Sequence, residues 1–506
     1  MKLGTAGLAA MTAPFAAFAQ TPGPIVVQQS AGSKRFEGAP DLHWRTSSVV
    51  NADTVTVDES RTYQEILGFG AAMTDAATYM ISQLNREARE RFLHELFHPD
   101  QLGMNVIRVC VGSSDFSRDV FSYDEGEPDP ELKRFSIDHD RAYILPQLVT
   151  ARRICPELFI LASPWSPPGW MKNGGSMLGG NMKPKYFSVY AQYLVKFLQA
   201  YEAAGVRVDA MTSQNEVDTE QAERMPACAW AQEHEVIFIS RHFGPALKAA
   251  NLETKIWLLD HNWNLWGRVF NTLEDPQVLK YVDGVAWHPY VGSPTAMTRI
   301  HDAYPSKHQY WTEGQFATAT RSALIRTAAT PGPMTQQPAA TPGPMTAPAT
   351  GQADTGVMDL SALHHEQPPD VAIAAGGTGG AMALRNWARC VIDWNVALDQ
   401  NGNPNIGPFV HSRGTTTIDS NTKEITRNPN YWVIKHYNHA ARRGARVIDS
   451  QGEIDGVAHV AFLNTDGRKC VVLSNRGEPR TIQLRVAGAS TEVSLPAHSV
   501  TNLNWT

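Results

Sequence analysis

The chain has 506 residues, of which 42% are hydrophobic and 19% are charged, and its formal net charge at pH 7 is −6. This length and apolar content suffice for a large buried core, arranged as two or three domains or as one large barrel with an appended module. The small, slightly acidic net charge, without a block of Lys or Arg, argues against a nucleic-acid partner. The five cysteines form no C-x-x-C pair, which excludes zinc-ribbon and thioredoxin-like sites.

The first residues have the pattern of a signal peptide. Lys2 precedes an Ala-rich apolar run that ends in Ala17-Phe18-Ala19, a small-x-small cleavage pattern. We therefore interpret residues 1–19 as a signal peptide and expect a secreted or periplasmic protein. The run is too short for a lasting anchor, and no other apolar stretch reaches the length of a membrane span, so we expect no stable membrane insertion.

Eight apolar segments with the character of β-strands alternate with helical segments. They cover residues 63–70, 103–111, 158–164, 208–214, 254–260, 282–290, 308–314 and 388–395. Strands that alternate with helices imply a parallel sheet, and eight such units are what a TIM barrel needs. The sequence therefore predicts an α/β fold with a (β/α)8 TIM barrel, which we assign to residues 63–444.

Three segments depart from the barrel pattern. Short alternating runs with Gly-containing turns predict an antiparallel β-sandwich over residues 445–506. Residues 20–62 contain strand-like pieces that we expect to contribute to the same sandwich. Residues 317–378 contain ATPGPMT twice and are dominated by Pro, Ala, Thr and Gly, so we interpret them as a flexible insertion in the barrel.

Polar and aromatic residues follow the predicted strands at the same end of each strand. In chain order these candidate site residues are Asp75, Arg108, Trp165, Asn215, Glu216, His288, Tyr290, Glu313 and Trp394. TIM-barrel enzymes carry their active sites at the carboxyl ends of the strands. A single glutamate after a strand more often opens a helix, and a single tryptophan more often belongs to the core. Their joint occurrence at the strand ends favours an active site.

Glu216 and Glu313 follow the fourth and seventh predicted strands, whose ends face each other across the barrel mouth. Retaining hydrolysis of a glycosidic bond needs two carboxyl groups about 5–5.5 Å apart, an acid/base and a nucleophile. We expect Arg108 to keep Glu313 ionised, and the charge on Glu313 to raise the pKa of Glu216, so that Glu216 can act as the acid. Asn215 beside it can hydrogen-bond a sugar hydroxyl.

Several longer motifs strengthen this interpretation. They are GFGAAMTDAA (68–77), NVIRV (105–109), LASPWSPPGWMK (161–172), QNE (214–216), HPY (288–290), TEG (312–314) and DWN (393–395). Together they resemble glycoside hydrolase family 30, which includes the glucosylceramidases. The resemblance implies a (β/α)8 barrel with an attached β-sandwich, Glu216 as acid/base and Glu313 as nucleophile.

The same resemblance implies roles for the remaining candidates. Asp75, Trp165 and Asn215 would bind the sugar, and Trp394 would form a wall of the pocket. Tyr290 would lie near the nucleophile, and His288 would support the site by hydrogen bonding. The expected substrate is a β-linked glycoside or glucan, and no metal or organic cofactor is implied. Val217 stands where many family members have Pro, and the loop 218–230 behind it is expected to border the leaving-group side.

Two other classes of protein, a metal-dependent hydrolase and a non-catalytic carbohydrate-binding protein, fit the sequence less well than a glycosidase. A metal-dependent barrel hydrolase would carry His-x-His after the first strand, where this chain has GFGAAMTD. A non-catalytic carbohydrate-binding protein would keep the aromatic residues and lose a carboxylate. Within the family, the MTDAA and DWN motifs favour a β-glucosidase or glucosylceramidase type of activity, and endo-β-1,6-glucanase, β-xylosidase and β-fucosidase activities are the alternatives.

Overall fold

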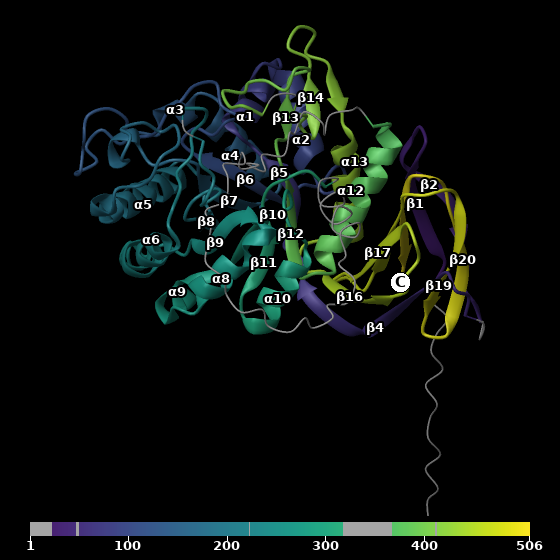
Figure 1. Cartoon of the computed structure of the whole chain (residues 1–506). Helices are drawn as coiled ribbons and strands as arrows, with labels where there is room; N and C mark the ends of the chain where they lie inside the picture. Colours follow the sequence, from purple (N-terminus) through teal and green to yellow (C-terminus); the bar gives the residue numbers. More distant parts are fainter. Residues whose placement is uncertain (1–22, 47–49, 222, 317–366, 410–411) are drawn as a thin grey trace, which may run out of the picture.

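Figure 1 shows the computed structural model of the chain, in which residues 23–46, 50–221, 223–316, 367–409 and 412–506 are described. The segment interpreted as a signal peptide and residues 317–366 of the predicted insertion lie outside the described residues. The described residues form a parallel barrel and an antiparallel sheet module, which lie side by side with two helices between them.

Eight parallel strands close into a barrel in chain order, with the last strand beside the first. They are β5 (Gly68–Ala72), β6 (Val106–Val111), β7 (Phe159–Pro164), β8 (Ala210–Thr212), β9 (Lys255–Asn262), β10 (Val282–His288), β11 (His308–Trp311) and β12 (Ala388–Asp393). The predicted TIM barrel is therefore confirmed. The strands are buried almost throughout, because helices cover the outside of the barrel.

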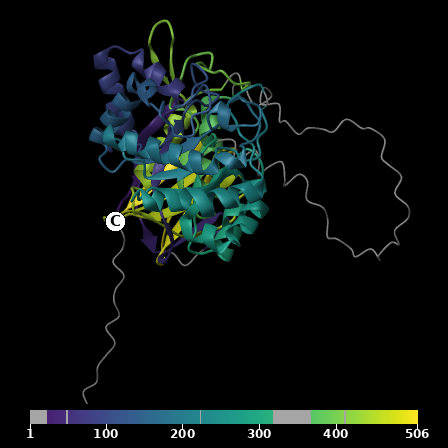
Figure 2. The same cartoon turned by 90° about the vertical axis from the view of Figure 1, so that its left-hand side faces the viewer.

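The helices surround the barrel, as the two views in Figures 1 and 2 show. They are α1 (Asp75–Ser82), α2 (Arg86–Phe97), α3 (Asp138–Arg141), α4 (Ile144–Ile154), α5 (Phe187–Ala203), α6 (Gln232–Ile237), α7 (Gly244–Ala249), α8 (Trp266–Leu273), α9 (Pro276–Tyr281), α10 (Thr295–Ala303), α12 (Pro369–Leu384) and α13 (Pro429–Ala440). The apolar residues of α5 recur every three or four positions and form one buried face, as expected for an amphipathic helix against a sheet.

The second module is a ten-stranded sheet built from both ends of the chain. Its strands are β1 (Ile25–Ala31), β2 (Lys34–Leu42), β3 (Arg45–Thr46), β4 (Thr54–Glu65), β16 (Arg446–Gln451), β17 (Val457–Leu463), β18 (Lys469–Asn475), β19 (Arg480–Val486), β20 (Ala489–Leu495) and β21 (Ser499–Trp505). Strand β1 pairs with β21, and β4 lies between β16 and β19. All pairings are antiparallel except β4 with β19. A separate small sheet contains β13 (Ala397–Leu398), β14 (Thr416–Ile418) and β15 (Ile425–Arg427).

The structure shifts the start of the barrel. The first barrel strand was expected to begin at residue 63, but β4 of the sandwich continues through Glu65 and β5 begins at Gly68. No turn residue separates the two strands, and Arg446 of β16 pairs with Glu65. Residues 63–65 therefore complete a sandwich strand.

The prediction of a flexible segment up to residue 378 is wrong for its last part, because α12 begins at Pro369. The glycines of this helix allow close packing on two sides. A Cβ at Gly377 would lie 2.5 Å from Val500 of β21, and one at Gly380 would lie 2.4 Å from the Tyr437 ring of α13. Glycine costs about 1 kcal/mol of helix propensity relative to alanine, and the packing of α12 between α13 and the sandwich outweighs this cost.

Two smaller findings concern membranes and thiols. Within the described part of the chain, no helix combines the length and the apolar character that crossing a bilayer requires. All five cysteines are buried and none is in a disulfide.

The interior of the barrel is layered, and the layering positions the site. An apolar layer contains Val106, Leu161, Ala210, Ala286 and Tyr310. Side chains two residues apart in a strand point to the same side. The residues two positions after the apolar ones therefore also face the barrel interior, and they form a second layer nearer to the carboxyl ends of the strands. It contains Arg108, Ser163, Thr212, His288 and Thr312, all buried. These polar side chains therefore lie together next to the apolar layer, at the carboxyl ends of the strands.

Candidate active site

Arg108 lies at the centre of the polar layer and is completely buried. Its guanidinium donates hydrogen bonds of 2.5 to 3.1 Å to the side chains of Ser163, Glu313, Asn215 and Asp260. Burial alone would lower the pKa of Arg108, but Asp260 and Glu313 raise it. The group therefore stays charged and links residues from five strand ends.

Asp260 reaches this layer through an irregularity in β9. Ala286 of β10 lies opposite Leu259, but the next residue, Trp287, lies opposite His261, so Asp260 is an extra residue. Leu259 and Asp260 have φ angles of 74° and 51°. Such left-handed conformations cost about 1–3 kcal/mol for non-glycine residues and gather at functional sites. The bulge turns Asp260 towards Arg108.

The Asp260 carboxylate has a full set of donors. It accepts hydrogen bonds from Arg108, Ser163, Thr212 and Thr312, and one oxygen lies 3.0 Å from Nε2 of His288. Burial would raise the pKa of Asp260, but the charge of Arg108 and the contacts with His288 and Thr312 hold it well below its usual range. Asp260 is therefore a buried anion that fixes Arg108 and His288 together.

Glu313 follows β11 and accepts hydrogen bonds from two donors, Arg108 of β6 and Tyr290 after β10. Its Oε2 accepts from Nη1 of Arg108, and its Oε1 accepts from the Tyr290 hydroxyl at 3.1 Å. Arginine is always protonated and cannot take up a further proton. Burial and the nearby charge of Glu313 raise the pKa of Tyr290 well above its usual value, so this group also donates. Arg108 and Tyr290 therefore hold the Glu313 side chain in place as hydrogen-bond donors.

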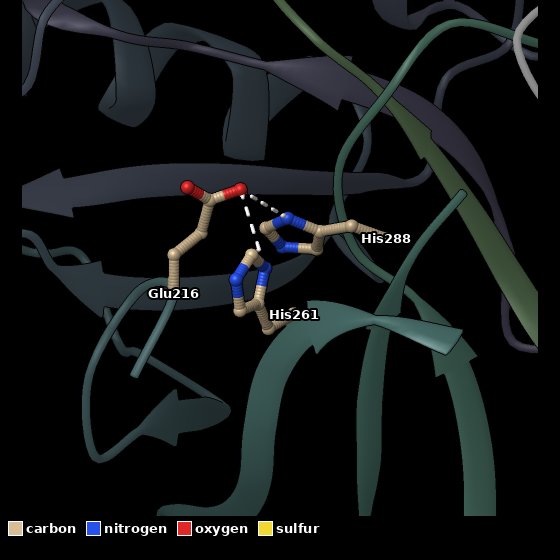
Figure 3. Close-up of side chains that lie close together, drawn as sticks. All are labelled: Glu216, His261 and His288. Carbon is tan, nitrogen blue, oxygen red and sulfur yellow. Dashed lines mark hydrogen bonds and ion pairs between the residues drawn. The ribbon is translucent and has the colours of Figure 1, made fainter. Parts of the chain in front are cut away.

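Glu216 follows β8 and has different neighbours (Figure 3). Its Oε1 lies 3.2 Å from Nδ1 of His288 and 3.4 Å from Nδ1 of His261, while Oε2 accepts from Thr219 at 2.9 Å. Its side chain is 16% exposed, against 7% for Glu313. An imidazole can both give and accept a proton, so the surroundings of Glu216 suit proton transfer.

Both glutamates lie close to the same nitrogen atom, Nδ1 of His288. Nδ1 of His288 lies 3.2 Å from Oε1 of Glu216 and 3.8 Å from Oε1 of Glu313. The two oxygens are therefore no more than about 7 Å apart, a limit that admits the ~5–5.5 Å spacing of retaining glycosidases. The folded barrel brings together two carboxylates that are far apart in the sequence.

The expectation that the pKa of Glu216 is raised is wrong. Burial does act in that direction, but the contacts with His261 and then His288 outweigh it and lower the pKa of Glu216 well below its usual range. The pKa of His261 rises correspondingly to about 10, because Glu216 and Asp218 outweigh the effect of its burial. These contacts favour the state in which Glu216 is a carboxylate and His261 is protonated.

The tryptophans and Asp75 complete the set of predicted residues. Trp165 and Trp394 stack on each other with ring centroids 5.2 Å apart, and the Arg108 guanidinium lies 4.7 Å from the Trp165 ring. They border the polar layer directly. Asp75 lies in the first turn of α1 and accepts from the Tyr143 hydroxyl and the Arg118 backbone N–H, so its contacts are separate from those of Arg108.

Four further residues contribute to the site although the sequence predicted no role for them. They are Asp115, Asp218, Asp260 and His261. Asp115 is buried, and its burial together with the charges of Glu313 and Glu216 raises its pKa well above the usual value. Asp260 and His261 were visible as a polar pair after the fifth strand, but their orientation depends on the bulge. Asp115 and Asp218 lie in loops without a periodic signal.

The side chains of Glu216, His261 and His288 offer donor atoms that all lie within 4.8 Å of one another. This spacing is compatible with a metal ion, but two carboxyl groups suffice for the double displacement at a glycosidic bond. Glu216 and His261 also form an ion pair, with Nδ1 3.4 Å from Oε1, which needs no metal.

Removing the buried cation is expected to destabilise the protein strongly. Arg108→Met leaves Asp260 and Glu313 as uncompensated buried charges, a change that typically costs about 3–5 kcal/mol. Arg427→Met is the matched control, because Arg427 forms its ion pair with Glu95 near the surface, where loss of a pair costs about 1 kcal/mol or less. Urea unfolding of the two variants checks this, and similar losses of stability would contradict the assigned role of Arg108.

Comparisons with known proteins identify both domains of the chain. The model of the glycosyl hydrolase family 30 TIM-barrel domain matches residues 66–327, and that of the glycosyl hydrolase family 30 beta sandwich domain matches residues 444–503. A putative glucosylceramidase 4 of Caenorhabditis elegans is 29% identical over 93% of this chain and 86% of its own length. An endo-1,6-beta-D-glucanase of Neurospora crassa is 30% identical over 83% of this chain and 81% of its own.

A solved structure, that of the endo-beta1,6-glucanase BT3312, superposes with a TM-score of 0.77 at 27% sequence identity. The superposition covers 96% of this chain and 100% of that one. The barrel model alone matches more than half of the chain, and both domains occur in the expected order. The chain therefore belongs to glycosyl hydrolase family 30.

Proposed function

We propose that this glycoside hydrolase cleaves β-glucosidic bonds by double displacement, with Glu313 as nucleophile and Glu216 as acid/base. The observation that carries the proposal is the convergence of both carboxylates on Nδ1 of His288. We also propose, from the N-terminal pattern, that the protein acts outside the cytoplasm, as a secreted or periplasmic enzyme.

The neighbours of the two glutamates support this division of roles. A nucleophile has to remain a carboxylate, and Glu313 is held by two donors, Arg108 and Tyr290. An acid/base has to gain and lose a proton in each cycle, and Glu216 contacts two histidines. Its greater exposure also suits the side on which the leaving group departs and water arrives.

The reaction then follows from these positions. Glu313 forms a bond to the anomeric carbon while the glycosidic C–O bond breaks and the leaving oxygen takes a proton from Glu216. Water next attacks the glycosyl-enzyme, gives its proton to Glu216 and releases Glu313 as a carboxylate. Asn215, which Arg108 holds at 2.7 Å, is placed to hydrogen-bond the sugar beside Glu216. The stacked Trp165 and Trp394 offer an apolar wall to a sugar ring.

The proposed glycone is a β-D-glucosyl unit. The relatives include a putative glucosylceramidase and an endo-1,6-beta-D-glucanase, and a glucosyl unit is common to both names. The intact MTDAA and DWN motifs favour exo-action of the β-glucosidase or glucosylceramidase type. The second candidate is endo-β-1,6-glucanase activity, which the similarity to the Neurospora crassa enzyme and to BT3312 favours.

Trapping the intermediate tests the mechanism. A 2-deoxy-2-fluoro-β-glucosyl fluoride should inactivate the enzyme with one label per chain, and peptide mass spectrometry should find the label on Glu313. Proton NMR of the first-formed product should show the β-anomer, since two inversions at one carbon give retention. Release of the α-anomer, or a label on another residue, would contradict the proposed roles.

A substrate panel tests the specificity. We expect turnover of 4-nitrophenyl β-D-glucoside to exceed that of the corresponding xyloside and fucoside by about tenfold or more, the discrimination that a few sugar contacts provide. Glucosylceramide and β-1,6-glucan then separate the two candidates. Rapid hydrolysis of xylan alone would exclude both.

A further inference from the structure

His261 is a buried neighbour of Glu216 that has no role in the proposed double displacement. It follows the bulge at the end of β9, and its side chain is 8% exposed. Nδ1 lies 3.4 Å from Oε1 of Glu216, and Nε2 lies 2.7 Å from Oδ1 of Asp218 (Figure 3 shows the contact with Glu216). Thr219 connects the same groups, because its hydroxyl lies 3.2 Å from Nε2 of His261 and donates to Oε2 of Glu216 at 2.9 Å.

We propose that His261, anchored by Asp218, is a positioning residue that stores the proton which Glu216 delivers to the leaving group. The proposal rests on the proposed role of Glu216 as acid/base and adds the source of its proton.

The orientation of the imidazole supports this role. Within the described residues, Nδ1 is buried without a hydrogen-bond partner, so Glu216, at 3.4 Å, is the ion-pair partner that it faces. Asp218 contacts the opposite ring nitrogen and is 46% exposed on its side chain. A histidine between two carboxylates is stabilised in its protonated form, with one N–H towards each of them.

The surrounding charges act in the same direction. Acidic groups face His261 from the loop after β8, where Glu216 and Asp218 lie. The ring of His288 from β10 packs edge-on at 5.9 Å, and it is itself tied to Asp260. Burial raises the pKa of Asp218, but the contact with His261 and the charge of Arg268 of α8 lower it. The pKa of about 10 for His261 agrees with this arrangement.

The proton balance is simple. In the free enzyme Glu216 is a carboxylate and His261 an imidazolium. As the glycosidic C–O bond breaks, the Nδ1 proton passes to Glu216, and a proton of the Glu216 carboxyl passes to the leaving oxygen. His261 is then neutral and still donates Nε2–H to Asp218. When water attacks the glycosyl-enzyme, its proton passes through Glu216 to Nδ1, which restores the starting state.

Two variants test the proposal with two substrates. His261→Gln removes the stored proton, and Asp218→Asn removes the charge that holds it. Gentiobiose, a β-1,6-linked glucose disaccharide, needs a proton on its leaving oxygen, whereas 2,4-dinitrophenyl β-D-glucoside does not. General acid catalysis contributes about 10²–10⁴-fold. We expect His261→Gln to lower kcat/KM for gentiobiose by about 10²-fold at pH 8 and to change that for the dinitrophenyl glucoside by less than about threefold.

The pH profile gives an independent readout. Loss of activity at high pH should follow deprotonation of the Glu216–His261 pair. In His261→Gln, Glu216 must hold the proton alone, so the alkaline limb for gentiobiose should move to lower pH by one unit or more. Asp218→Asn should move it in the same direction by less. All assays contain EDTA, so that no metal at these groups contributes.

Several outcomes would overturn the proposal. An equal fall on both substrates would mean a merely structural role for His261, and an unchanged alkaline limb would mean that it stores no proton. ¹⁵N NMR of the intact enzyme offers a test without mutation, because the His261 ring should remain doubly protonated at pH 8. His98→Gln is the matched control, since His98 pairs with Asp100 on the surface and should leave the profile unchanged. Azide rescue of Glu216→Ala tests the role of Glu216 separately, so the two proposals can fail independently.

Discussion

Replacing Glu313 by glutamine is expected to lower kcat/KM for 4-nitrophenyl β-D-glucoside by about 10⁵-fold, since removal of a nucleophile costs about 10⁶ in another class of hydrolase. The amide keeps the size of the side chain and an oxygen that can accept from Tyr290, but it cannot form the glycosyl-enzyme. The variant should therefore still bind glucose-type ligands, with a dissociation constant within a few-fold of the parent. Steady-state kinetics and isothermal titration calorimetry measure the two quantities.

This experiment also separates the enzyme from a carbohydrate-binding protein of the same fold. A binding protein would be indifferent to Glu313→Gln in every assay. Glu233→Gln, at an exposed position in the first turn of α6, is the control and should retain full activity. Retention of more than about one per cent of the activity in Glu313→Gln would show that another group attacks the anomeric carbon.

Replacing Glu216 by alanine is expected to produce a loss that depends on the leaving group. For gentiobiose, which needs protonation, kcat/KM should fall by about 10²–10⁴-fold. For 2,4-dinitrophenyl β-D-glucoside the first step needs no acid, so the glycosyl-enzyme should accumulate while its hydrolysis slows. A burst of dinitrophenol in stopped-flow experiments would report this accumulation.

Azide tests the same position chemically. A small anion can occupy the space left by the Glu216 carboxylate and attack the glycosyl-enzyme without base catalysis. We expect azide to restore turnover of the dinitrophenyl substrate and to yield β-glucosyl azide, which NMR identifies. Hydrolysis of gentiobiose should not recover, because azide cannot supply the missing proton. The formation of α-glucosyl azide would be inconsistent with attack on a covalent intermediate at Glu313.

The strand pattern predicted which residues lie together at one end of the barrel, for a physical reason. Inward-facing residues in a barrel strand repeat every two positions. Because Val106 belongs to the apolar layer, Arg108 belongs to the polar layer next to it. The same alternation relates Ala286 to His288. In the folded chain Arg108, Asn215 and Glu313 are joined by direct hydrogen bonds. Their chemical roles stay proposals until the variants above are measured.

The prediction from the sequence pattern is wrong for α12, where tertiary packing outweighs local helix propensity. The first part of α12, up to residue 378, contains Gly376 and Gly377, and the sequence predicts it as part of a flexible insertion. It is helical because Gly377, and Gly380 just beyond it, permit contacts with Val500 and Tyr437 that are closer than any side chain would allow. Such an effect depends on the neighbours of a helix, and these come from distant parts of the sequence.

By itself, the sequence determined the barrel, the sandwich, the family and the end of the strands at which polar residues gather, because these follow from periodicity and from local motifs. Only the tertiary structure decided how the charges are connected. Strict alternation in β9 gives no reason to expect that Asp260 faces inward, and only the bulge brings it to Arg108 and leaves His261 beside Glu216. The charge state of Glu216 and His261 depends on the distance of a few ångströms between two residues from different strand ends, and barrel closure together with the bulge sets that distance.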